Sequence, residues 1–221
     1  DSSFILMFAK YASKAFDFQQ TLDNFYAHQH RDGFIPREIR EKDGAEVYAR
    51  LDPSSTGPAI LSWCEYEYYL YSGDESRLRN VYYPLLAYHL WMKKNRTWRN
   101  GTYFLSGLGC GMDNAPRQER GCNPRYEHGH MIWIDACFQA LIDCDMLLKI
   151  AAVSGIDDGV AELRAEKESL GNFINRNLWD EKTGFYYDMY RGNQLSGVKT
   201  VASFWSLLSG SIPDERASRL T

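Results

Sequence analysis

A loose repeat of helix, glycine turn and long loop constrains the fold of this chain more than any other feature. Helical segments end in a charged or aromatic turn followed by a glycine and two aromatic or apolar residues: RDGFIP at 31–36, RNGTYF at 99–104 and KTGFYY at 182–187. A long polar loop and then a more apolar helix come after each turn. Such a repeat is typical of stacked helical hairpins, in which an outer helix returns through a loop to an inner one. The short segments after the glycines are expected to pair as small strands.

Apolar residues recur at helical spacing along most of the chain, which predicts an all-α fold. Pro58 suits the first turn of a helix, Pro84 is expected to kink one, and Asp157 is expected to cap another. The expected helices cover residues 4–30, 58–71, 75–98, 133–153, 157–179, 200–210 and a last segment from 214.

Three loops, at 32–56, 99–132 and 182–199, are unusually long. Loops above about 12–15 residues in a compact domain are usually functional or disordered. Because all three occupy the same phase of the repeat, we expect them to collect at one end of the assembly. A rim of long loops over a ring of helices is a natural place for a site.

Composition and charge argue against several classes of protein. The net charge is −4, without a basic run, so nucleic acid is not an expected partner. No apolar stretch approaches the length of a membrane span. The start, DSSFILMFAK, has an apolar burst but lacks the flanks of a signal peptide. The compartment therefore stays open between cytoplasmic and periplasmic or secreted.

The cysteines and histidines predict no metal centre. None of the 5 cysteines forms a CxxC pair. Cys110 and Cys122 could form a disulfide if the chain between them folds back, and free buried thiols are the alternative. Residues two apart diverge on a helix, and no cysteine or carboxylate completes zinc spacing around His28/His30 or His128/His130. A phosphate-cradling glycine motif is also missing.

Residues 107–117, GLGCGMDNAPR, place one carboxylate, Asp113, in a glycine-rich loop beside Asn114 and just before Arg117. Glycines allow backbone angles and close approaches that side chains block, although in loops they usually serve only as turns. A loop that ends in an acid, an amide and a guanidinium suits the floor of a pocket. Aromatic residues make up 14% of the chain, and such rings either fill the core or line sugar-binding clefts.

The stretch SGLGCGMDNAPR resembles the general-acid loop of glycoside hydrolase family 63 and of related enzymes, including trehalases and mannosylglycerate hydrolases. Further blocks match the same group in the same order: GPAILSWCEYEYYLYSGD at 57–74, WIDACFQALIDCDMLLKIAAVSG at 133–155, FINRNLWDEKTGFYYDMY at 173–190 and TVASFWSLLSG at 200–210. The resemblance covers nearly the whole chain. It implies an (α/α)6 toroid, a carbohydrate substrate and no cofactor.

The expected helices make only about half of such a toroid. We therefore expect residues 1–221 to be a single catalytic domain that is incomplete at its C-terminal end. The missing half would come from further sequence or from a second chain, because an open half-toroid exposes apolar faces.

Glycosidic cleavage needs an acid that protonates the leaving oxygen and a second carboxylate on the other side of the sugar. The resemblance assigns the acid to Asp113, for which a loop-capping role is the structural alternative. It also implies inversion of configuration, with the two carboxyl groups about 6.5–9.5 Å apart. The base would be a Glu downstream of the 200–210 block, outside this chain.

The resemblance implies further sugar-contacting residues, and each has a plainer structural alternative. Arg117 could bind hydroxyls or hold the acid loop, and Asn114 could fix its turn. In the block at 133, Ala136–Cys137 replaces the family's Leu-Asn, so Asp135 could cap the helix instead. The remaining candidates, for which core packing or surface ion pairs are the alternatives, are Trp133, Trp63, Glu65, Arg37, Glu38, Tyr187 and Trp205.

The expected function is that of an inverting α-glycosidase acting on α-glucosidic or α-mannosidic linkages in oligosaccharides or small glycosides. A trehalase-like hydrolase is an alternative that shares the fold and the acid loop. A non-catalytic carbohydrate-binding or interaction domain and a helical scaffold are the alternatives from other classes. The Gly-Met-Asp-Asn loop and the three aligned long loops argue against the scaffold.

Overall fold

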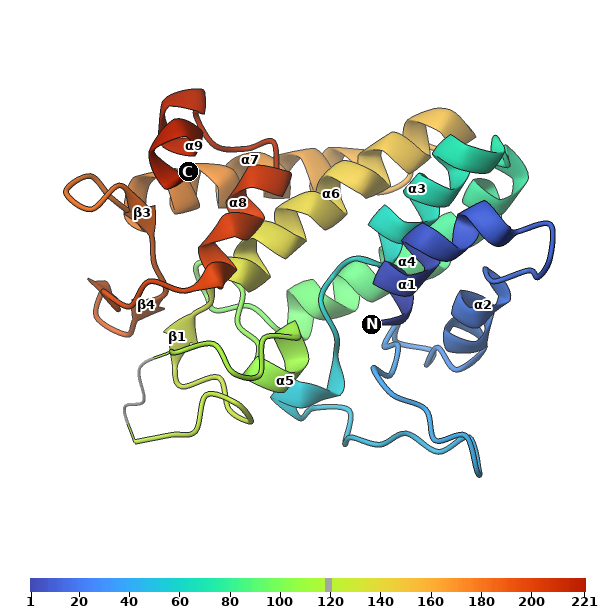
Figure 1. Cartoon of the computed structure of the whole chain (residues 1–221), viewed down its shortest axis with the longest axis horizontal. Helices are drawn as coiled ribbons and strands as arrows, with labels where there is room; N and C mark the ends of the chain where they lie inside the picture. The colour runs from blue at the N-terminus through green and yellow to red at the C-terminus, as the bar shows by residue number, and fades with distance from the viewer. Residues whose placement is uncertain (118–120) are drawn as a thin grey trace.

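The computed structural model describes residues 1–117 and 121–221, and it is mostly helical, as the sequence predicts (Figure 1). Short 3-10 segments and small strands occupy the turns between the helices. The helical elements are α1 (Ser2–Ala9), η1 (Lys10–Ala12), α2 (Gln20–Ala27), η2 (Pro53–Ser55), α3 (Leu61–Ser72), α4 (Glu75–Asn95), α5 (Gly107–Cys110), α6 (Ile134–Ser154), α7 (Val160–Asn177), η3 (Val201–Phe204), α8 (Trp205–Leu208) and α9 (Asp214–Leu220).

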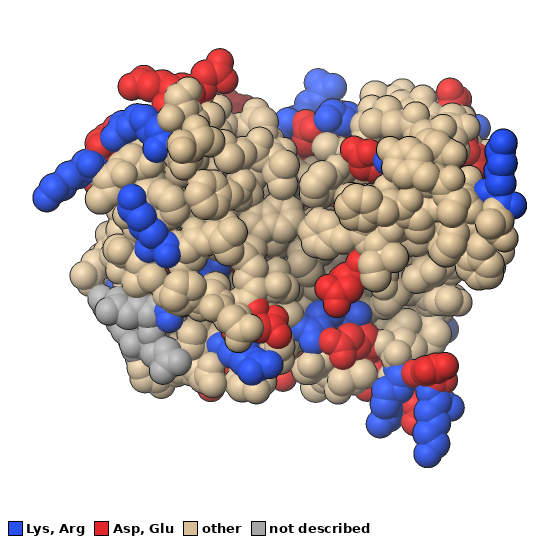
Figure 2. Space-filling view, viewed as in Figure 1, with Lys and Arg blue, Asp and Glu red and all other residues tan. Residues whose placement is uncertain are grey.

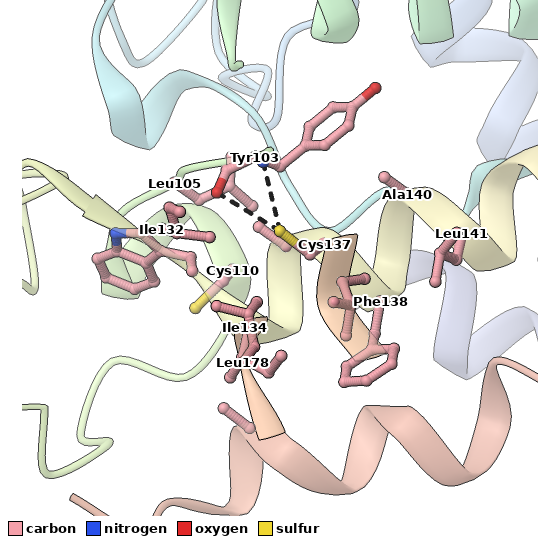
Figure 3. Packing of buried hydrophobic residues seen from close by; sticks show 14 of the residues in the cluster. Tyr103, Leu105, Cys110, Ile132, Ile134, Cys137, Phe138, Ala140, Leu141 and Leu178 are labelled. Carbon is pink, nitrogen blue, oxygen red and sulfur yellow. Dashed lines mark hydrogen bonds between the residues drawn. The ribbon is translucent and has the colours of Figure 1, made fainter. Parts of the chain in front are cut away.

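Helix α6 forms the centre of the molecule and contacts α3, α4, α7 and α8 (Figure 1). Its first residues, 134–144, are buried on every side, which is the pattern of a helix that lies inside a core. The Cys137 thiol points toward Tyr103, where it accepts a bond from the backbone amide and faces the carbonyl oxygen (Figure 3). The segment before the acid loop is thus attached to the first turn of α6.

The predicted pairing of extended segments is found after two of the three repeat glycines, whereas residues 34–36, after Gly33, form no strand. After Gly184, β3 (Phe185–Tyr186) pairs with β2 (Trp179–Asp180), and after Gly101, Tyr103 makes an isolated bridge to Thr97. A second small sheet joins β1 (Met131–Ile132), β4 (Met189–Tyr190) and β5 (Gln194–Leu195), all antiparallel. The β1–β4 pair connects the second long loop to the third.

The first repeat glycine, Gly33, is required by a close contact between the turn and α4. Its φ angle is +97°, and a Cβ atom there would lie 2.3 Å from the carbonyl oxygen of Ala87. Only glycine satisfies both the angle and the approach. The turn can therefore press against the outer helix and direct the following loop toward the site.

The long loops gather at one edge of the molecule, as predicted. Figure 1 shows the loop at 32–56, α5 with the described residues that follow it, and the β1–β4 region along the same lower edge. Because these segments come from different hairpins, their side chains meet only in the folded chain.

Three predicted helix features are wrong. Pro58 does not lie in the first turn of a helix, because α3 begins three residues later, at Leu61. Residues 4–30 do not form one helix: α1 and η1 end at Ala12, and α2 begins at Gln20. Phe16 and Phe18 are two residues apart and cannot share a helical face, and the chain turns there so that Gln19 donates to Glu65 at 2.9 Å. Gly159, with φ +77°, precedes α7 in place of the expected cap Asp157.

All 5 cysteines are free thiols, so the alternative of a Cys110–Cys122 disulfide is not realised. Within residues 1–117 and 121–221, no helix combines the length and apolar character that crossing a bilayer requires.

Candidate active site

Asp113 follows a single helical turn, α5, that its own sequence explains. Ser106 caps this turn, because its hydroxyl oxygen accepts from the amide of Gly109 at 3.0 Å. Gly111 ends the turn with a φ angle of +76°. A Cβ atom on Gly109 would lie 2.7 Å from the carbonyl oxygen of Pro53, so this glycine lets the turn touch the first long loop. The sequence predicts a loop at these residues, whereas the structure forms a helical turn although glycines disfavour helix.

Loops on both sides clamp α5. The amides of Gly107 and Leu108 donate to the carbonyl oxygens of Pro124 and Arg125, at 2.7 and 2.9 Å. On the opposite side, the hydroxyls of Ser54 and Ser106 lie 2.7 Å apart in a buried contact. The turn before Asp113 is therefore fixed by segments from two different hairpins.

A cleft of about 1230 Å³ runs along this edge, and residues 111–116 form one wall. Figure 2 shows the hollow in the middle of the face, with acidic and basic side chains at its lower edge. The lining is completed by residues from the N-terminus, α2, the first long loop, the segment 57–61, α4, α5 and residues 199–201. A cleft of this size can hold a small-molecule ligand against the wall that carries Asp113.

The Asp113 carboxylate is partly exposed in this wall, with 36% of its side chain accessible. Its ion-pair partner among the described residues is Arg125, whose Nη2 lies 3.8 Å from Oδ2. Because the Arg125 side chain is itself 47% exposed, the pair contributes little to stability. Sequence analysis missed Arg125, which gives no local signal beyond a charged residue in a loop.

Arg117 is buried behind the cleft rather than exposed in it. Its Nη2 lies 2.7 Å from Asp135 Oδ2, and its Nε lies 3.6 Å from Asp188 Oδ2. The guanidinium stacks on the ring of Trp133, 3.7 Å from the ring centroid. Burial opposes the charge of Arg117, but the two carboxylates outweigh it and raise its pKa.

Two sugar-contact candidates, Trp133 and Asp135, have no exposed surface. The indole of Trp133 donates to the carbonyl oxygen of His128 at 2.9 Å, and Asp135 accepts from the amide of Ala136 at 2.9 Å. Both sit at the start of α6, underneath the acid loop. In this structure they support the loop and do not reach the cleft.

Arg37 and Glu38 lie in the cleft lining, as does Asn114. Arg37 donates to the Tyr48 hydroxyl at 2.8 Å and also bonds the Glu38 carboxylate and the carbonyl oxygen of Leu108. Arg37 thus connects the first long loop to α5, and Glu38 remains half exposed at the mouth. A carboxylate at the mouth can accept hydrogen bonds from sugar hydroxyls.

The aromatic candidates Trp63 and Trp205 pack against each other outside the cleft lining. Their ring centroids are 6.5 Å apart at an interplanar angle of 75°, and Phe4 lies edge-on to Trp63. This contact joins α1, α3 and α8. Tyr187, another candidate, is buried, and its hydroxyl donates to Thr183 at 3.0 Å.

Glu65 is also fully buried, within a polar cluster between α2, α3 and α4. Its carboxylate accepts from Gln19 and Tyr26 at 2.9 Å each and from the Arg77 Nε at 2.7 Å. These partners neutralise the buried charge and occupy the carboxylate, so Glu65 anchors helices rather than substrate.

A further polar cluster, unforeseen from the sequence, surrounds His89. Its Nδ1 bonds Asp143 at 2.8 Å and its Nε2 faces Glu166 at 3.3 Å, with Cys144 beside it. One donor atom each of His89, Cys144 and Glu166 lies within 4.8 Å, a set that can hold a metal ion. Lys93 Nζ, however, lies 2.7 Å from Glu166 and compensates its charge. The arrangement is that of a satisfied polar network in the core.

The family model described as the mannosylglycerate hydrolase MGH1-like glycoside hydrolase domain matches residues 1–221. A protein of Borreliella burgdorferi with no assigned function is 26% identical over 99% of this chain, which spans 43% of that relative. A cytosolic neutral trehalase of Kluyveromyces lactis is 37% identical over 62 residues, which are 28% of this chain and 7% of the trehalase.

Among solved structures, the GH63 mannosylglycerate hydrolase of Thermus thermophilus in complex with Tris is similar with a TM-score of 0.80. The identity is 19%, and the match covers 100% of this chain and 68% of that one. This likeness establishes the fold, which is of the (α/α)6 type in that family. The chain thus spans less than half of the Borreliella relative and about two thirds of the Thermus enzyme.

Proposed function

Because this chain belongs to the mannosylglycerate hydrolase MGH1-like glycoside hydrolase family, we propose that Asp113 is the general acid of an inverting α-glycosidase. The Asp113 carboxyl would protonate the leaving oxygen while a second carboxylate activates a water on the other face of the sugar. The observation that carries this proposal is the placement of Asp113. It stands in the cleft wall on a turn that two loops clamp, whereas Asp135 and Glu65 are buried and engaged.

The general base is proposed to be a Glu outside these 221 residues. The relatives that match this chain are longer than it is, which leaves room for such a residue in the full protein. The proposed domain is accordingly a single (α/α)6 toroid to which residues 1–221 contribute the acid and the cleft around it.

The proposed substrates are small α-glucosides or α-mannosides. The Thermus enzyme with the same fold is described as a mannosylglycerate hydrolase, and one of its structures holds Tris and D-glycerate. The cleft here includes Arg37, Arg40 and Lys199, cations that suit hydroxyl-rich or carboxylate-bearing aglycones. Arg117, being buried, is proposed to act on the acid loop and not on the sugar.

A trehalase-like activity is the second candidate, favoured by the trehalase of Kluyveromyces lactis that matches part of this chain. The two candidates differ in the aglycone and share the acid. For trehalose the cleft must accommodate a second glucose as the leaving group, whereas for mannosylglycerate it must accommodate a small carboxylic acid. Competition between the two substrates therefore separates the two activities.

The experiment is to incubate the full-length protein with mannosylglycerate, trehalose and an α-glucosyl oligosaccharide, and to follow the products by proton NMR. The proposal predicts release of the β-anomer of the sugar from one of these substrates, because inversion converts an α linkage to a β product. With mannosylglycerate, initial release of the sugar as the α-anomer would contradict inversion. With trehalose, inversion releases one β-glucose and one α-glucose, because the leaving sugar keeps its own configuration, so initial release of α-glucose alone would contradict it. Binding without turnover of any substrate would favour the non-catalytic carbohydrate-binding alternative.

A further inference from the structure

Three segments far apart in the sequence converge on a buried ion cluster behind the acid loop. Arg117 ends that loop, Asp135 lies in the first turn of α6, and Asp188 lies between β3 and β4. All three side chains are buried, with exposed fractions of 6%, 0% and 3% respectively. Asp188 also accepts from the amide of Ile134 at 2.9 Å, which ties it to the N-terminus of α6.

The backbone between Arg117 and Asp113 is short and internally bonded. The Arg117 amide donates to the carbonyl oxygen of Ala115 at 2.7 Å, and the Ala115 amide donates to the carbonyl oxygen of Met112 at 3.0 Å. The Met112 amide in turn donates to the carbonyl oxygen of Gly107 at 3.1 Å. Pro116 removes one more rotatable angle from this path. A displacement of Arg117 would therefore be transmitted to Asp113.

The other end of the acid loop is buried as well. Cys110, the last residue of α5, is buried beside Asp135; burial, and after it the charge of Asp135, raises the pKa of the thiol well above its usual value. Within α5 the Cys110 thiol also donates to the carbonyl oxygen of Gly107 at 3.5 Å, so the residue before segment 111–116 is buried and fixed, and the residue after it is paired with Asp135. Asp113 itself is held more weakly, with Arg125 at 3.8 Å.

We propose that Arg117 is a positioning residue for Asp113: by binding Asp135 and Asp188 and stacking on Trp133, it holds the acid in line with the leaving oxygen. The inference rests on the proposed role of Asp113 and adds what sets its position. A planar guanidinium can bind two carboxylates and an aromatic face together, whereas a lysine ammonium is a point charge that cannot reproduce this geometry. The conservative replacement Arg117→Lys should therefore preserve the charge and lose the alignment.

The test compares two substrates that differ in their need for an acid. An alkyl or glyceryl α-glycoside leaves as an alkoxide and requires protonation, whereas the matching α-glycosyl fluoride releases a weakly basic fluoride ion. The kcat on the O-glycoside divided by the kcat on the fluoride measures how well the acid is placed. This quotient is called the ratio below. It is determined for the full-length wild type, Arg117→Lys and Asp113→Asn.

Arg77→Lys is the matched control. It makes the same exchange in another partly buried ion cluster, on Glu65 and Asp23, which is remote from the acid loop in sequence and does not line the cleft. For Arg117→Lys we expect the ratio to fall about 10- to 100-fold with KM nearly unchanged, because a small misplacement of a catalytic group has that cost. For Arg77→Lys the ratio should equal that of the wild type, whatever happens to the melting temperature.

A ratio in Arg117→Lys equal to that of the wild type would overturn the inference. If that variant does not fold, Asp135→Asn, which keeps the shape of the side chain, takes its place with the same expected fall and the same contradicting result. The two proposals fail separately. An unchanged ratio in Asp113→Asn refutes Asp113 as the acid, whereas a reduced ratio there with a normal ratio in Arg117→Lys refutes only the positioning role.

Discussion

At the scale of single residues, the chain separates its carboxylates by how fully their charge is neutralised. Glu65, Asp135 and Asp188 are enclosed with arginines at short distance, while Asp113 remains partly exposed in a cleft wall. A paired buried carboxylate stabilises packing but has no access to substrate. The accessible carboxylate on a rigid turn is the one suited to proton transfer.

The motif around Asp113 could be identified from sequence, but the burial of its neighbours could not. Glu65 and Asp135 sit in blocks that resemble those of a sugar-binding family, and their partners Arg77 and Arg117 come from other elements. Spacing along a helix carries no information on such distant partners. The same reason applies to Arg125, which follows Asp113 by twelve residues in the sequence and comes close to it only in the folded chain.

Replacing Gly109 by alanine should destabilise the turn that carries the acid. The new Cβ atom would lie 2.7 Å from the carbonyl oxygen of Pro53, so α5 or the 50–56 segment must move. We expect a loss of about 1–3 kcal/mol in the free energy of unfolding, measured by urea denaturation. Gly57→Ala is the control, because its Cβ atom meets only an ordinary contact at 3.5 Å. Equal stability of Gly109→Ala and wild type would contradict the close packing of α5.

At the scale of elements, one polar network joins the helices that support the site. It links α3 through Ser62, α4 through His89, α6 through Asp143 and α7 through Glu166. The hydroxyl of Tyr103 adds the segment before α5 by donating to Glu166. Such a network fixes the relative positions of the helices because every member would be costly to leave unpaired.

The stability of the protein should depend on pH through this network. Burial lowers the pKa of His89, but its bonds to Asp143, Cys144 and Glu166 outweigh burial, and the pKa lies well above 6.5. A raised pKa means that the stabilisation is complete below 6.5 and is lost as pH rises through the folded-state value. In the wild type, the urea concentration at the midpoint of unfolding should therefore decrease as the pH rises from 6.5 toward the folded-state pKa of His89. In His89→Gln it should decrease less.

The control for this prediction is His28→Gln, because His28 is exposed and belongs to no such cluster. A pH dependence in His89→Gln as steep as in the wild type would contradict the charged state of His89. On the acid side the sign reverses: burial raises the pKa of Glu166, but His89, Lys93 and Tyr103 lower it to about 2. Its stabilisation is present above the ordinary value of 4.5 and is lost as pH falls toward 2.

The elements themselves were predictable where periodicity was long and the ends were marked. Helix α6 ends at Ser154 before Gly155, as the sequence predicts, and α3 ends before Gly73. The prediction of one helix over residues 4–30 is wrong because the apolar residues there fit a helix on average, whereas the contact of Gln19 with Glu65 requires a turn. Helix α5 was missed because a glycine-rich sequence has no helical propensity and is held by its neighbours.

At the scale of the whole molecule, two helices at the edge of the assembly expose apolar side chains. On α1, Ile5 and Phe8 are 63% and 76% exposed, and on α8, Leu207 and Leu208 are 41% and 55% exposed. Large apolar side chains that gather on exposed helix faces are usually covered by a partner in a native protein. We propose that further helices of the same toroid cover it, in keeping with the greater length of the relatives.

This proposal predicts that the protein isolated from its source has an intact mass well above 25.5 kDa, the mass of these 221 residues. Denaturing mass spectrometry gives the length of the chain, and native mass spectrometry reveals a second chain if there is one. A monomer of 25.5 kDa that hydrolyses glycosides would contradict both the completed toroid and a base outside this chain.

The most direct test of the central claim is the kcat of Asp113→Asn on an O-linked α-glycoside, relative to its kcat on the matching α-glycosyl fluoride. If Asp113 is the general acid, hydrolysis of the O-glycoside falls about 10²–10⁴-fold, while hydrolysis of the fluoride, which needs no proton, is largely retained. Arg77→Lys, which lies outside the cleft lining, serves as the control and should keep the wild-type values on both substrates. Equal losses on both substrates, or full activity on the O-glycoside, would show that Asp113 does not donate the proton.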